Sequence, residues 1–191
     1  MNNIKALKRI AATLFCCLIS STALSETVTG IDPRVIESRK VVKEFSGQLI
    51  KELKHAMEEG GPLKAIKVCN IEAPDIAAEL SDKYEWDIGR TSLKTRNPNN
   101  NPDEWELTAL QQFEQRMKNG EDITKLEYYE TTTEGFRYMK AIPTKDLCLT
   151  CHGTAIPETV KAALVELYPE DKAIGFKAGG IRGAFSIIQN K

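Results

Sequence analysis

Residues 33–59 constrain the fold of this chain more than any other stretch, because they predict one long amphipathic helix. Asp32 can cap its amino end, and Pro33 suits the first turn, where a missing N–H costs nothing. Gly60-Gly61-Pro62 is expected to end it. The apolar side chains that recur at helical spacing are Val35, Val42, Phe45, Leu49, Leu53 and Ala56.

The other helices are predicted to be shorter. Pro74-Asp75 and Pro157 each mark a helix start, and Gly120 marks a stop. We therefore expect helices over residues 63–70, 74–80 and 102–119, and one that begins at Pro157 and buries Val160, Leu164 and Leu167.

Alternating patterns predict the strands. In "YEWDI", Tyr84, Trp86 and Ile88 fall on one face, and two later runs around a short Gly-containing turn predict a β-hairpin. A helical amino-terminal half that leads into a small antiparallel sheet predicts an α+β fold. The expected strands cover residues 84–88, 126–132, 136–142 and 180–189.

Residues 1–25 predict a signal peptide rather than a part of the fold. A basic cluster precedes the apolar run "IAATLFCCLIS", and Ala23-Leu24-Ser25 places small residues where a signal peptidase reads them. We expect Sec-type export, cleavage before Glu26, and one domain over residues 26–191 of a periplasmic or otherwise exported protein. The apolar run is short for a membrane span, so no stable membrane insertion is expected after cleavage.

The charge pattern argues against a nucleic-acid partner. Residues 1–25 carry Lys5, Lys8 and Arg9 and no acid, so cleavage changes the formal net charge from −1 to −4. Acidic and basic residues are interspersed, without the basic stripe that nucleic acid requires.

The cysteines limit the chemistry further. Cys16 and Cys17 lie in the predicted signal peptide, and a lipidated cysteine there is the minor alternative, because neither follows a small residue. The mature chain keeps Cys69, Cys148 and Cys151. Three is an odd number in an oxidising compartment, where thiols are usually paired or attached to a group.

Cys148 and Cys151 belong to the motif "CLTCHG", which has three readings. A structural zinc site needs four ligands, commonly from two pairs, and only one CxxC pair is present. A thioredoxin-like motif is expected early in a βαβ unit. Covalent haem fits best, because two cysteines at this spacing can form thioethers with both vinyl groups while His152 binds the iron. We therefore expect one haem c per chain.

The second axial ligand of the iron stays open on the residues alone. A lysine, water or an open site would each serve, and His55 is expected to be solvated. Among the methionines Met57, Met117 and Met139, the last is the best placed, since it lies on the strand that leads to the motif. Cys69 is the thiol left over after attachment, and it would be a soft anionic donor.

The segments "VCNIEAPDIAAEL", "IGRTSLKTRNPNNNPDEWE", "LCLTCHG" and "YPEDKAIGFKAGGIRGAFSI" together resemble the c-type haem-binding family with a PAS-like fold. The resemblance implies an antiparallel sheet of about five strands, flanked by helices, with one covalent haem. It also implies that family members occur both as free exported haem proteins and as sensor modules of histidine kinases and chemoreceptors. In at least some members the cysteine that matches Cys69 is the second axial ligand.

A basic stretch offers counter-charges for the haem propionates. Arg90, Lys94 and Arg96 are the candidates, with Arg182 as a further one, and the competing interpretation is a solvated strand edge and loop.

These observations predict an exported monohaem c-type cytochrome that acts in one-electron transfer or redox sensing with His152 and Cys69 as axial ligands. The alternative is a sensor of carbon monoxide or nitric oxide that works with a separate partner. For either role, the expected partner of this chain is a redox protein or a membrane-bound signalling protein. A peroxidase-type enzyme ranks last, since only His55 would remain as an acid-base histidine.

Overall fold

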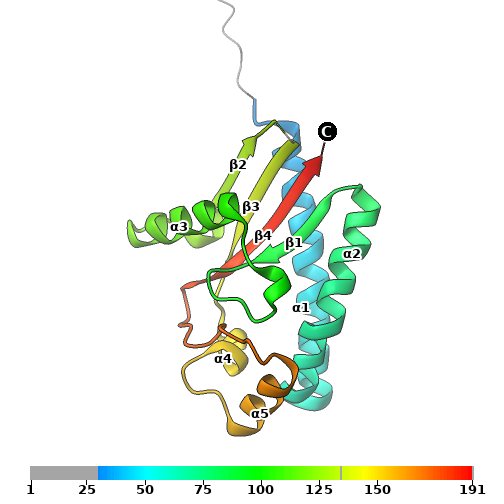
Figure 1. Cartoon of the computed structure of the whole chain (residues 1–191), viewed down its shortest axis with the longest axis vertical. Coiled ribbons are helices and arrows are strands. Elements are labelled where there is room, and N and C mark those ends of the chain that lie inside the picture. The colour runs from blue at the N-terminus through cyan, green and yellow to red at the C-terminus, as the bar shows by residue number, and fades with distance from the viewer. Residues whose placement is uncertain (1–29, 134, 191) are drawn as a thin grey trace, which may run out of the picture. The chain divides into compact units, whose positions relative to one another are not determined.

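In a computed structural model, the described residues are 30–133 and 135–190, and they form an antiparallel sheet flanked by helices (Figure 1). The predicted signal peptide lies outside these residues. Within them the sheet has four strands in the order β1-β4-β3-β2, where the resemblance implied about five. The strands are β1 (Asp87–Thr91), β2 (Glu127–Thr131), β3 (Gly135–Pro143) and β4 (Ile181–Asn190). The predicted α+β fold, its hairpin and its last strand are confirmed.

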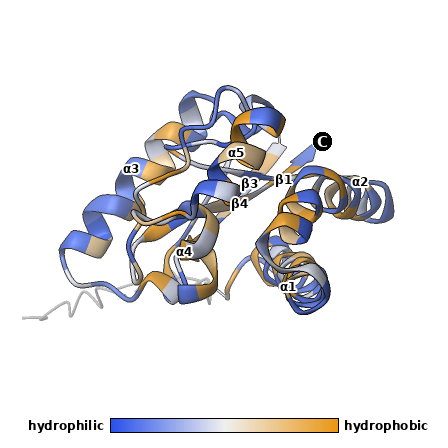
Figure 2. Cartoon of the chain, turned by 90° about the horizontal axis from the view of Figure 1, so that it is seen from below, coloured by the Kyte–Doolittle hydropathy of each residue, from blue (hydrophilic) through white to orange (hydrophobic). Residues whose placement is uncertain are grey.

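Helices cover both faces of the sheet. The view in Figure 2 places α1 (Pro33–Lys67) and α2 (Ala73–Tyr84) on one side and α3 (Glu104–Lys118) on the other. Two further helices, α4 (Asp146–His152) and α5 (Glu158–Leu167), lie at one end of the sheet. The described residues also form short helical turns, which are η1 (Val68–Glu72), η2 (Pro98–Asn100) and η3 (Ile123–Lys125).

Strand alternation divides the core between these two layers. Phe136 and Tyr138 of β3 pack on the α1 side, while Met139 and Ala141 pack against α3. Because successive side chains of a strand point to opposite faces, one strand supplies both cores. The buried stripe of α1 that meets the first core contains Val35, Val41, Phe45, Leu49 and Ala56, and the predicted Val42 and Leu53 pack against it partly buried.

The long first helix breaks where predicted but resumes at once. Gly61 has φ +64° and ψ −159°, a conformation that costs glycine little, and Pro62 follows it. Helical geometry then continues through Lys67, η1 and α2.

The first strand starts later than predicted, which is a correction. Tyr84 is the last residue of α2, and Glu85 closes that helix in the left-handed conformation (φ 56°). Apparent alternation across "YEWDI" therefore spans a helix end and a turn. Strand β1 instead contains Gly89 and Arg90, and Arg90 pairs with Phe185 of β4.

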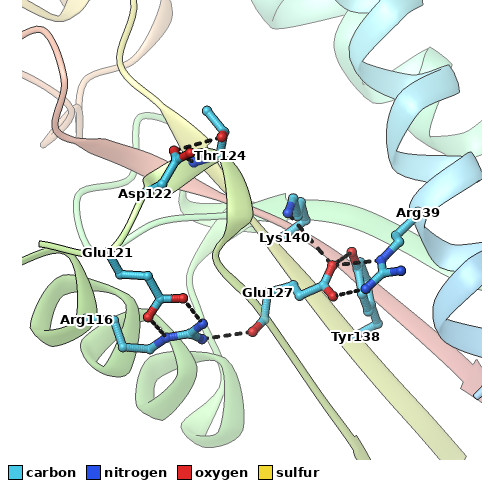
Figure 3. Close-up of polar contacts among 8 residues, drawn as sticks. All are labelled: Arg39, Arg116, Glu121, Asp122, Thr124, Glu127, Tyr138 and Lys140. Carbon is cyan, nitrogen blue, oxygen red and sulfur yellow. Dashed lines mark hydrogen bonds and ion pairs between the residues drawn. The ribbon is translucent and has the colours of Figure 1, made fainter. Parts of the chain in front are cut away.

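A polar network joins α1 to the sheet (Figure 3). Glu127 of β2 pairs with Arg39 of α1 and accepts a hydrogen bond from Tyr138 Oη at 2.9 Å. Its backbone oxygen accepts a hydrogen bond from Arg116 Nη1 at 2.9 Å, and Arg116 also pairs with Glu121. Burial opposes ionisation of Glu127, but Arg39 and Tyr138 outweigh it and lower the pKa of that carboxyl group.

No helix in the described ranges is both long enough and apolar enough to cross a membrane.

Candidate functional site

One cavity gathers the four residues that the sequence predicts for attaching the haem and binding its iron. It has a volume of about 380 Å³, and Cys69, Cys148, Cys151 and His152 all line it. The cavity lies between α1, the adjoining end of the sheet and α4. No disulfide joins Cys69, Cys148 and Cys151 to one another.

The CxxCH segment is helical. Residues 146–152 form α4, which puts Cys148 and Cys151 three positions apart on one helix face. The helix closes at Gly153, whose N–H donates to the Leu149 oxygen at 2.9 Å. A Cβ on Gly153 would lie 2.5 Å from that oxygen, so the glycine of "CLTCHG" allows this close approach.

His152 is held by the segment that follows α5. Its Nδ1 lies 2.7 Å from the Ala173 oxygen, and the Phe176 ring meets the imidazole edge-on at 6.1 Å between centroids. Burial, aided by Arg182 and Arg96, holds the pKa of His152 well below its usual value. The imidazole is therefore neutral near pH 7. Its Nδ1–H donates to the Ala173 carbonyl, so Nε2 carries no proton and its lone pair can bind a metal.

Cys69 reaches the cavity on a π-helical turn. The Ala73 N–H bonds to the Val68 oxygen, five residues back, in place of the α-helical pairing. Pro74 follows directly and has no N–H for Asn70, so the α-helical pattern could not have continued there. The break predicted between residues 70 and 74 is therefore a π turn, which no local pattern indicated and which presents the half-buried thiol.

The other proposed axial donors are mostly elsewhere. His55 is exposed, as expected of a solvated side chain, and its Nε2 lies 3.3 Å from Glu59 Oε2. Met139, the favoured methionine, is fully buried on the α3 side of the sheet, and Met117 packs in the same cluster. The preference for Met139 was therefore wrong: a strand that leads to the motif still points alternate side chains away from it. Met57 lines the cavity.

The predicted basic residues separate into three environments. Arg90 and Arg182 line the cavity, while Lys94 lies outside its lining and donates to the Ile174 oxygen at 3.2 Å. Arg96 lines the cavity too, but its guanidinium is engaged: Nε is 3.0 Å from Asp171 Oδ2. No sequence pattern indicated this ion pair.

Arg90 and Arg182 have no carboxylate partner within the described part of the chain. Burial lowers the pKa of Arg90, which stacks over Phe45 at 5.6 Å. Burial and the charges of Arg96 and Arg90 lower the pKa of Arg182 to about 10. Two cations held together in a cavity wall suit an anionic group that enters it.

The part of the cavity lining that α1 supplies is mainly apolar. Leu49, Leu53 and Met57 project from α1 at four-residue spacing, and Phe185 adds an aromatic ring from the sheet. The cavity thus offers apolar surface, two thiols and a neutral imidazole on one helix, and a third thiol from a distant segment.

The comparisons agree with this geometry. A model of the Tll0287-like family matches residues 20–190. Similar solved structures include one titled "Crystal structure of the cyanobacterial heme-protein Tll0287", with 25% identity and a TM-score of 0.66. The similarity covers 84% of this chain and 97% of that chain. Among curated proteins no significant match was found. The resemblance to a haem-binding family is thereby confirmed.

Proposed function

We propose that this chain, which belongs to the Tll0287-like family, is a monohaem c-type protein with one haem attached through Cys148 and Cys151. In this proposal His152 and Cys69 are the axial ligands of the iron. The observation that carries it is the single cavity lined by all four side chains. The solved relative titled a heme-protein adds support at the level of the family.

The residues around the cavity fit such a group. Thioether attachment needs two thiols in reach of one edge of the porphyrin, and α4 supplies both from one face. The apolar stripe of α1 suits the macrocycle. Arg90 and Arg182 are cations without a carboxylate partner in the described chain, and the two propionates would supply the missing negative charge.

Each protein group then has a distinct task. When bound, haem supplies one-electron chemistry at iron. The Ala173 carbonyl holds the imidazole of His152 in one tautomer, with Nε2 free for the metal. Cys69 supplies a soft donor whose anionic form favours ferric iron. Apolar side chains from α1 keep water from the macrocycle.

The role that this arrangement supports best is one-electron transfer or redox sensing. His152 and Cys69 both belong to the folded chain, so with these two ligands neither oxidation state would need an external one. The proposal includes a separate redox partner or a membrane-bound signalling protein, and export through the predicted signal peptide. Export is tested by fractionation: the protein is expected in the periplasmic fraction, and a chain without residues 1–25 should stay in the cytoplasm without covalent haem.

Covalent attachment is tested with the full chain co-expressed with a cytochrome c maturation system. A haem stain on a denaturing gel and the intact mass should both report one haem per chain. Cys148→Ala with Cys151→Ala should abolish the stain. Cys69→Ala is the matched control, because it removes a thiol from the same cavity and should keep the attachment. Wild-type protein without covalent haem would refute the proposal.

A further inference from the structure

We infer that Arg96 is a positioning residue for the haem ligand: its guanidinium ties α4 to residues 171–173 and thereby fixes the imidazole of His152. This inference rests on the proposed function and assigns Arg96 a task other than the propionate contact that its sequence position suggested.

The guanidinium of Arg96 hydrogen-bonds both to α4 and to residues 171–173, and we call this set of contacts the clamp. The side chain is 7% exposed and comes from the segment between β1 and η2. Its Nη2 donates to the Cys151 oxygen at 2.5 Å and lies 3.4 Å from the Ala173 oxygen. Its Nε donates to Asp171 Oδ2 at 3.0 Å. One planar group therefore holds α4 and residues 171–173 together. This geometry suits a guanidinium and not an ammonium.

The Ala173 peptide connects this clamp to the ligand. Its oxygen accepts from both Arg96 and His152 Nδ1, the latter at 2.7 Å, and its N–H donates to Asp171 Oδ1 at 2.7 Å. Asp171 thus pairs with Arg96 and also orients the peptide that orients the imidazole. Groups that hydrogen-bond to a metal-binding imidazole control its direction and its basicity.

Two backbone hydrogen bonds join the end of α4 to Gly175 and Phe176, and we expect both to depend on the clamp. The Phe176 N–H donates to the His152 oxygen at 2.9 Å, and the Gly175 N–H donates to the Gly153 oxygen at 3.0 Å. These two bonds bridge a segment without regular structure to the end of a short helix. Without the guanidinium they should open more often, and His152 would then have no fixed acceptor for Nδ1.

The test compares Arg96→Lys with Arg116→Lys. Arg116 is a matched control, because it also pairs with a carboxylate, Glu121, and donates to a backbone oxygen, that of Glu127, outside the cavity lining (Figure 3). Lysine keeps the charge but loses the fork. We expect amide hydrogen exchange at Gly175 and Phe176 to rise about tenfold or more in Arg96→Lys, because one charge-assisted hydrogen bond is lost.

The haem-loaded variants give the second readout. Arg96→Lys should broaden or shift the ferric low-spin EPR signal, whereas Arg116→Lys should leave it unchanged. Arg96→Gln also removes a positive charge beside the ligand and should lower the reduction potential below that of Arg96→Lys. If Arg96→Lys fails to fold, Asp171→Asn decides, since it breaks the same ion pair and should accelerate exchange at the same two amides.

The two proposals fail separately. Hydrogen exchange in the apoprotein tests the clamp even if no haem is bound, whereas absence of covalent haem from the wild type refutes the proposed function alone. Unchanged exchange at Gly175 and Phe176 in Arg96→Lys, or in Asp171→Asn where the first variant does not fold, would overturn the inference.

Discussion

Gly153→Ala should destabilise the protein, although alanine can adopt the backbone conformation at this position. Gly153 has φ −76° and ψ −166°, which suits any residue. The obstacle is steric: a Cβ would lie 2.5 Å from the Leu149 oxygen and 3.2 Å from Leu149 Cβ. The oxygen belongs to the backbone of α4, so it can move only if the helix end moves.

The expected magnitude follows from two opposing terms. Forcing atoms into a filled space costs about 1–3 kcal/mol, while replacing glycine by alanine restricts the unfolded chain and returns about 0.4–1 kcal/mol. A net loss of about 1–2 kcal/mol would lower the Tm of a domain of this size by roughly 2–8 °C. The shift should also weaken the bond between the Gly175 N–H and the Gly153 oxygen.

The assay is thermal and urea unfolding of the apoprotein, so the result does not depend on haem. Gly47→Ala is the matched control: Gly47 lies in the interior of α1 on its exposed side, and a Cβ there meets no atom within 4 Å. This variant should gain about 0.5–1 kcal/mol. A Gly153→Ala protein as stable as Gly47→Ala would show that the end of α4 is not tightly packed, and the steric argument would be wrong.

Three further predictions concern the core, the polar network and the cavity. Met139→Ala should lose about 2–5 kcal/mol of unfolding free energy in urea titrations and leave the ferric spectrum unchanged, because its side chain is buried away from the cavity; an altered spectrum with intact fold would contradict this. Glu127 has a lowered pKa in the folded state, so its stabilising effect is complete above the unfolded value and is lost as pH falls through the folded one; between about pH 5 and 3, Glu127→Gln should therefore lose less stability than the wild type, and equal acid sensitivity would count against the network. Arg90→Leu should raise the unfolding free energy of the apoprotein, since an unpaired cation leaves the cavity wall, yet it should lower the stability gained on haem attachment; a destabilised apoprotein would argue that Arg90 already has its partner.

Local patterns predicted most of the fold. The helix predicted over residues 102–119 is α3, which starts at Glu104, where Asp103 and Glu106 bond to each other's backbone N–H. The helix predicted to begin at Pro157 is α5, which starts at Glu158. Errors arose where one pattern serves two structures. Alternation at "YEWDI" predicts a strand from Tyr84, but the segment contains the end of α2, the turn at Glu85 and only the first two residues of β1.

The cavity was predictable only in part. The spacing within "CLTCHG" identified Cys148, Cys151 and His152, and the leftover thiol pointed to Cys69. Local patterns cannot distinguish Arg96 from Arg90, because the carboxylate that pairs with Arg96 is Asp171, which lies 75 positions away in the chain. Such a pairing depends on how the segment after α5 returns across α4, and no local pattern encodes it.

The most direct test of the account is the ferric EPR spectrum of purified, haem-loaded protein compared with that of Cys69→Ala. The wild type should give one low-spin species, and the variant should lose it, because the second axial donor has been removed while Cys148, Cys151 and His152 still hold the haem. Identical spectra would show that Cys69 does not bind the iron and would contradict the claim that this cavity joins the two distant segments around one metal.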